Sequence, residues 1–144
     1  MAKNSIRFSA APRKNFPSRD RMKACLTQTA HRFGIERFQL QYIFVDDEAL
    51  LEMNRNFLQH DYYTDIITFN LSESVDFLEG EIYISFDRIH ENARINFVPV
   101  EEEFCRVMAH GLLHLCGLND HSASEKAKMR EAEEAFLLLY KDSE

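Results

Sequence analysis

The chain has 144 residues, of which 45% are hydrophobic, 28% charged and 12% aromatic, which fits one globular domain and excludes a repeat array or a disordered tail. The formal net charge of -7 excludes a protein that coats nucleic acid indiscriminately, because such proteins carry an excess of Lys and Arg. No stretch reaches the roughly 20 apolar residues of a membrane span, and the first residues lack the apolar run of a signal peptide. We therefore expect a cytoplasmic protein without a membrane partner.

The first half of the chain predicts strands and helices in alternation. Residues 5–10 favour a strand, and residues 18–33 favour a helix that Gly34 ends. Alternating apolar residues predict a strand over 36–45, and an aspartate cap then begins a helix over 46–58.

The second half predicts two strands followed by three helices. The expected elements are strands over 65–70 and 81–86 and helices over 87–95, 100–116 and 122–140. No composition break or linker interrupts them, so residues 1–144 predict a single α+β domain with a small mixed sheet and helices packed on it.

Charge is unevenly distributed along the chain. Residues 1–37 carry nine basic side chains against two carboxylates, whereas the remainder is strongly acidic. This segment either forms a local basic surface for an anionic partner or is the solvated face of the first helix, and charge alone favours the second interpretation.

The three cysteines, Cys25, Cys105 and Cys116, are widely spaced and odd in number. This spacing neither builds a disulfide framework nor matches a metal-binding CxxC pair. We expect reduced and mostly buried thiols.

The segment MAHGLLHLCGLNDH carries the clearest chemical pattern. His110 and His114 lie four residues apart on a predicted helix and therefore share one face. Gly117 ends that helix and turns the chain, so that His121 can supply a third nitrogen to the same ion. Three histidines leave Zn²⁺ an open position and lower the pKa of its bound water to about 7, which predicts a hydrolytic centre with one zinc per chain.

The segment resembles the zinc peptidase helix HExxHxxGxxH, with two departures. Gly111 stands where those peptidases carry the glutamate general base, which argues against peptide hydrolysis, and the last spacing is one residue longer. A glycine inside a helix costs about 1 kcal/mol relative to alanine, so we expect either the close approach of a ligand or backbone at Gly111 or a packing contact there.

The same segment resembles the signature HGxLHLxGYDH of the YbeY family of bacterial endoribonucleases and ribosomal RNA maturation factors. Upstream, MNRNFLQHDYYTDIITF is similar to the family block N-x-x-[YF]-R-x-x-D-x-x-T-[DN]-V-L-S-F, and GEIYIS is similar to G-[DE]-I-x-I-S. The resemblance covers about residues 40–122. It implies a zincin-like histidine-bearing helix and a zinc-dependent endoribonuclease that hydrolyses single-stranded RNA in late small-subunit ribosomal RNA maturation and ribosome quality control.

The resemblance also implies partners and site residues. RNA of the small ribosomal subunit, with a ribosomal protein or a GTPase as assembly partner, is expected, and DNA is not. Leu58 stands where the family has an arginine that acts on phosphate, so Arg55 or an arginine of the basic segment would take that role. Asp120 would orient a histidine or bind the metal itself.

Two other functions stay open. A metal-stabilised ribosome-assembly module without turnover is consistent with Leu58 at the arginine position. A zincin-like peptidase would need a general base that Gly111 does not provide.

Overall fold

The computed structural model describes residues 4–143. Its elements are β1 (Ser5–Ser9), α1 (Arg19–Arg32), β2 (Phe38–Val45), α2 (Asp47–Leu58), β3 (Ile66–Asn70), β4 (Leu78–Ser85), α3 (Phe86–Asn96), α4 (Val100–Leu115) and α5 (Ala123–Asp142). The predicted α+β fold is confirmed, and the element boundaries differ from the expected ones by a few residues at most.

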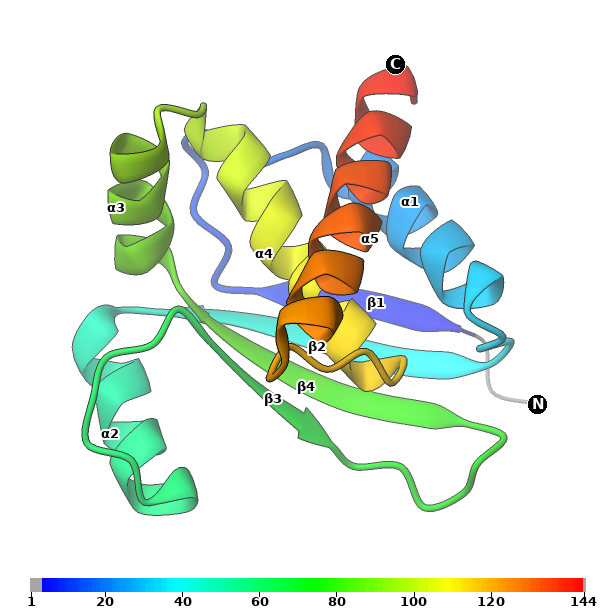
Figure 1. The fold of residues 1–144 in the computed structure, drawn as a ribbon, viewed down its shortest axis with the longest axis horizontal. Coiled ribbons are helices and arrows are strands. Elements are labelled where there is room, and N and C mark those ends of the chain that lie inside the picture. Colours follow the sequence, from blue (N-terminus) through cyan, green and yellow to red (C-terminus); the bar gives the residue numbers. More distant parts are fainter. Residues whose placement is uncertain (1–3, 144) are drawn as a thin grey trace.

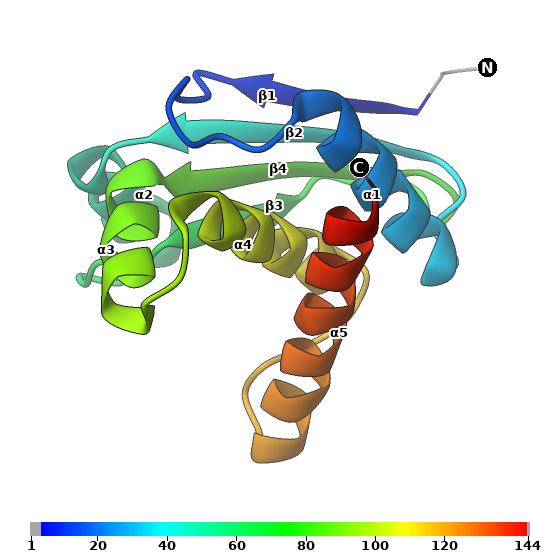
Figure 2. The same cartoon turned by 90° about the horizontal axis from the view of Figure 1, so that it is seen from above.

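The four strands form one mixed sheet in the order β1-β2-β4-β3. β1 pairs with β2 and β2 pairs with β4 in parallel, whereas β3 pairs with β4 in antiparallel orientation and lies at the edge. Helices α1, α4 and α5 lie above the sheet and α2 lies below it (Figure 1). Seen from above, the strands follow one another in this order, and α4 lies beside β4 and β3 (Figure 2).

Two glycines make room for side-chain packing between helix α4 and the sheet. A Cβ atom at Gly111 would lie 2.9 Å from Ile66 Cδ1 and 2.9 Å from Ile82 Cγ2, and one at Gly80 would lie 2.5 Å from Leu115 Cδ1. Real Cβ atoms do not approach other atoms this closely. The glycine inside the histidine helix therefore serves packing against β3 and β4, which resolves the two possibilities that the sequence left open.

The core also holds α4 in place through a buried hydrogen bond. Tyr42 of β2 is fully buried, and its hydroxyl donates to the backbone oxygen of Met108 over 2.8 Å. Burial raises the pKa of Tyr42, so this hydroxyl stays a donor. The contact fixes the helix two residues before His110. None of the described helices is long and apolar enough to cross a membrane.

Candidate metal centre

The last two turns of α4 present two histidine side chains on one face. The rings of His110 and His114 have centroids 4.5 Å apart and planes inclined by 82°. Their side chains are 22% and 25% exposed, so both are reachable from solvent while resting against the protein. The predicted spacing of the pair on one helix face is confirmed.

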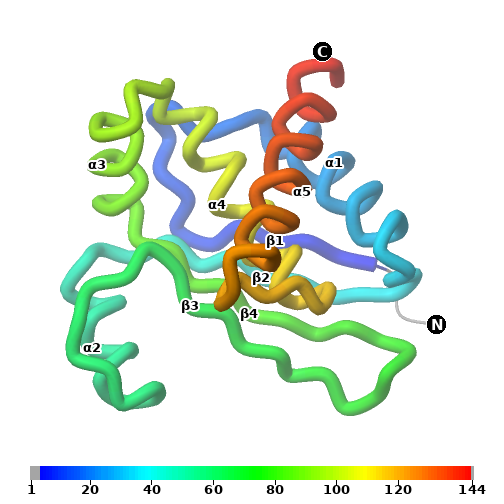
Figure 3. Tube along the Cα trace, in the orientation of Figure 1, coloured from blue at the N-terminus to red at the C-terminus, as the bar shows by residue number. Residues whose placement is uncertain are grey.

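The loop after α4 brings a carboxylate to this pair. Gly117 has a positive φ of 106°, a conformation that suits glycine and lets the chain reverse after the helix. Asp120 Oδ2 lies 3.6 Å from His110 Nε2 and 3.4 Å from His114 Nε2. The chain path in Figure 3 shows this loop joining the end of α4 to the start of α5.

His121 directly follows Asp120 in this loop but has different contacts. Its side chain is exposed, and its backbone N–H donates to Glu125 Oε1 over 3.2 Å, next to the capping box that Ser122 and Glu125 form at the start of α5. The three side chains whose ligand atoms lie within 4.8 Å of one another are His110, His114 and Asp120, without His121. The third-ligand role of His121 stays a prediction.

A buried carboxylate orients the first histidine. Glu133 of α5 is 9% exposed, and its Oε2 lies 2.6 Å from His110 Nδ1. A proton on Nδ1 donated to this carboxylate leaves the lone pair of Nε2 directed toward Asp120. Burial lowers the pKa of His110, but the hydrogen bond and the charge of Glu133 more than offset this and raise it. The arrangement favours a histidine with a fixed tautomer.

The orienting carboxylate is itself held by an arginine. Arg106 of α4 lies 3.4 Å from Glu133 Oε1 and 3.1 Å from Glu134 Oε1, and it also lies 3.8 Å from Glu103. Sequence analysis did not identify Glu133, because it lies 23 residues from His110 on another helix and no spacing rule connects them.

Asp65, directly before β3, is a half-buried carboxyl group whose charge interacts with that of His110. Its backbone oxygen accepts a hydrogen bond from the Ser85 N–H over 3.0 Å, which fixes the start of the edge strand. Burial raises the pKa of Asp65, whereas the charges of His110 and Arg88 lower it, and the net direction is upward. Asp65 is thus a carboxyl group beside the histidines with an increased tendency to hold a proton.

The arginine expected at the site is engaged elsewhere. Arg55 pairs with Asp61 at 2.5 Å, and among residues 4–143 no ion pair joins it to the histidine group. Leu58 is 41% exposed. Arg88 of α3 is the arginine whose charge acts on Asp65, and Asp47 holds its guanidinium with contacts of 2.9 to 3.1 Å. Arg88 carried no signal in the sequence, since it lies in an ordinary helix turn.

The donor set and its spacing fit a zinc ion. Tetrahedral Zn²⁺ with ligand bonds of roughly 2.0–2.1 Å separates its ligand atoms by about 3.3 Å. The separations of 3.4 and 3.6 Å from Asp120 Oδ2 to the two histidine nitrogens are close to this value. Two imidazoles and one carboxylate also leave one position free, as in catalytic sites.

Comparisons with known proteins agree with the fold and the motifs. The family model described as Endoribonuclease YbeY matches residues 8–141. A protein of Cytophaga hutchinsonii named Endoribonuclease YbeY is 48% identical over 123 residues, covering 85% of this chain and 86% of the relative. A namesake from Porphyromonas gingivalis is 43% identical over 118 residues, covering 82% and 78%. A solution structure from Thermotoga maritima matches with a TM-score of 0.67 at 27% identity, covering 94% of this chain and 89% of that one.

Proposed function

Because the chain belongs to the YbeY family of endoribonucleases, we propose that it is a zinc-dependent enzyme that cuts single-stranded RNA during maturation of small-subunit ribosomal RNA. The observation that carries this proposal is the convergence of His110, His114 and Asp120, with separations that suit a tetrahedral ion and one position left for substrate. When bound, zinc supplies a positive charge that offsets the negative charge developing on the phosphodiester.

Two carboxyl groups near the histidines have separate roles in metal binding and in proton transfer. Glu133 holds the Nδ1 proton of His110 and keeps Nε2 free for the metal. The half-buried carboxyl group of Asp65 takes up the proton of the attacking water and returns it to the leaving oxygen. A carboxyl group whose pKa is raised suits this role, because its pKa then lies closer to the neutral pH at which it must accept and return a proton.

The phosphate needs a cation, and two arginines are candidates. Arg55 would have to leave Asp61 to reach a substrate, since the two side chains pair at 2.5 Å. Arg88 is also paired, with Asp47, but its charge, unlike that of Arg55, acts on Asp65 next to the metal centre. We therefore favour Arg88 for phosphate contact, and Arg88→Gln should slow RNA cleavage more than Arg55→Gln.

Metal content and cleavage together test the proposal. Purified untagged protein should contain about one zinc per chain by mass spectrometry, and His110→Ala and Asp120→Ala should lose it. The zinc-loaded protein should cut single-stranded RNA but leave a duplex of the same sequence intact. His121→Ala identifies the third ligand. If that variant loses zinc while Asp120→Ala retains it, His121 and not Asp120 is the third ligand. Wild type that binds no zinc when zinc is supplied would refute the metal centre.

A second candidate function is ribosome assembly without cleavage. It rests on Leu58 at the family arginine position and on the engagement of Arg55 by Asp61. In that case RNA or ribosome association persists with no cut products, and Leu58→Arg creates activity. A ribosomal protein or a GTPase would be the partner in either function, and association with small subunits in cell extracts tests that contact.

A further inference from the structure

The unpaired cations of this acidic protein gather in two neighbouring segments. Within residues 4–143, the Lys and Arg side chains that pair with carboxylates are Arg55, Arg88, Arg94, Arg106 and Lys141. Every other Lys or Arg of this range lies between residues 7 and 37 or between residues 126 and 130, and forms no ion pair with a carboxylate of the range. These two segments contain α1 and the first half of α5.

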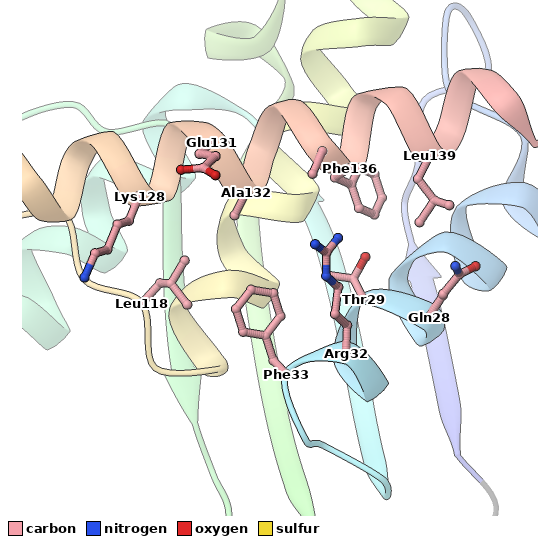
Figure 4. A pocket seen from close by; sticks show the side chains of 11 residues that line it. Gln28, Thr29, Arg32, Phe33, Leu118, Lys128, Glu131, Ala132, Phe136 and Leu139 are labelled. Carbon is pink, nitrogen blue, oxygen red and sulfur yellow. The ribbon is translucent and has the colours of Figure 1, made fainter.

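A groove runs between these two helices. It has a volume of about 500 Å³, and its apolar lining includes Phe33 at the end of α1, Leu118 in the α4–α5 loop and Phe136 of α5. Phe33 is 38% exposed, so its ring is available to a ligand. In the view of Figure 4, Phe33 lies between Leu118 and the side chain of Arg32. We call this cavity the α1–α5 groove.

The rim of the α1–α5 groove carries two cations and one carboxylate. Arg32 reaches from α1 toward α5, and Lys128 extends from α5 (Figure 4). Neither pairs with a carboxylate of residues 4–143, although Glu131 also lines the groove. A net positive rim over an apolar floor suits a ligand with a flat apolar part and more than one negative charge.

Not every residue of the basic segment is available in this way. Arg21 donates to the Tyr140 backbone oxygen over 2.6 Å and to Ser143 Oγ over 3.0 Å, and its guanidinium lies 4.0 Å from the Tyr140 ring centroid. Arg21 therefore fastens α1 to the end of α5. Arg32 is the cation of α1 that lines the groove.

The α1–α5 groove and the metal centre share a loop. Leu118 lines the groove, and Asp120, two residues further along, lies beside both histidines. Two residues of extended chain span at most about 7 Å. The end of the groove that Leu118 lines therefore adjoins the loop that carries Asp120.

We propose that the α1–α5 groove binds a nucleotide of the single-stranded RNA next to the cleaved bond. The base packs on Phe33 and Leu118, and the flanking phosphates contact Arg32 and Lys128. Aromatic stacking combined with backbone charge is how proteins hold single strands without reading sequence, and a paired base could not enter such a groove. This inference rests on the proposed endoribonuclease function and adds where the substrate lies.

The first test measures RNA binding separately from cleavage. Full-length protein in the presence of a chelator is titrated into fluorescent oligouridine, and anisotropy is recorded over a range of salt concentrations. The double variant Arg32→Gln with Lys128→Gln should reduce the slope of log affinity against log salt by about 1.4, because each phosphate contact to a single strand contributes roughly 0.7. Glu131→Gln should increase affinity, since Glu131 is the one carboxylate that residues 4–143 contribute to the groove lining.

A matched pair controls for net charge. Arg94→Gln with Lys141→Gln removes one Arg and one Lys that are 71% and 64% exposed and do not line the groove. The slope of this control should equal that of wild type. An equal change of slope in both double variants would mean that only total charge matters and would overturn the proposal.

The second test isolates the base. Phe33→Leu keeps an apolar side chain but removes the ring, and should weaken oligouridine binding about fivefold or more. The same variant should bind an abasic ribose-phosphate oligomer as tightly as wild type does. If Phe33→Leu binds oligouridine as tightly as wild type does, the base does not bind in the groove.

Cleavage assays separate this inference from the function on which it rests. If zinc-loaded wild type cuts RNA while the Arg32 and Lys128 double variant binds like its control, the groove proposal fails and the endoribonuclease stands. If wild type cuts no RNA but the double variant loses binding, the groove stands and the cleavage proposal fails.

Discussion

Glu133→Gln tests whether a carboxylate on α5 tunes the metal centre on α4. The substitution preserves the shape of the side chain and an oxygen that can accept the His110 Nδ1 proton, but it removes the charge. Hydrogen bonds to charged groups contribute roughly 1.5–3 kcal/mol and neutral ones about 0.5–1.5 kcal/mol. A difference of about 1.4 kcal/mol corresponds to a tenfold change in an equilibrium constant. Since the contact is partly buried and 2.6 Å long, we expect the zinc dissociation constant of the variant to be about tenfold larger than that of wild type.

Competition with a chromogenic chelator at neutral pH measures this constant, and a thermal melt of the metal-free protein confirms folding. Glu134→Gln is the matched control, because Glu134 contacts the same Arg106 at 3.1 Å, is 57% exposed and has no contact with His110. Arg106 keeps Glu103 and Glu134 in the Glu133 variant, so no cation is left unpaired. Equal zinc affinity in Glu133→Gln and wild type, or an equal loss in the control, would refute the orienting role.

Three further predictions concern the scaffold. Tyr42→Phe removes the hydrogen bond to Met108 and should cost about 0.5–1.5 kcal/mol of unfolding free energy, measured by urea denaturation. Burial raises the pKa of the Asp47 carboxyl, but Arg88 and Ser85 outweigh burial and lower it below the ordinary value of 3.8. The stabilisation by the ionised carboxylate is therefore present above pH 3.8 and is lost as the pH falls below that value. Asp47→Asn should match wild type in stability only in strong acid, as urea denaturation at a series of pH values would show. Burial raises the pKa of Cys116 to about 11, so a thiol reagent at mildly alkaline pH should react slowly with native protein and quickly with all three thiols after unfolding.

The elements around the centre could be predicted because their signals are local. Ser122 and Glu125 form the predicted capping box, Gly117 ends the histidine helix, and Asp46 caps α2. Each of these features depends on residues within one turn of each other, which a sequence displays directly. The same locality explains why His110 and His114 could be placed on one face.

The remaining features of the site depend on how distant segments pack. Asp120 and His121 are neighbours in an irregular loop, and a motif shows that both can reach the ion without showing which one turns toward it. The contact of Glu133 with His110 requires the relative placement of α4 and α5, and the role of Arg88 requires that of α3 and β3. Spacing within a segment does not encode either arrangement.

The contact between α5 and His110 links the opening of the C-terminal helix to metal occupancy. If α5 must remain docked for zinc to bind, zinc at one hundred times its dissociation constant adds about 2.7 kcal/mol to the free energy of that local opening. Backbone amides of α5 that exchange with solvent through this opening should then exchange about a hundredfold more slowly in the metal-loaded protein. Hydrogen exchange along one peripheral helix would thus report the state of a centre whose ligands lie entirely outside it.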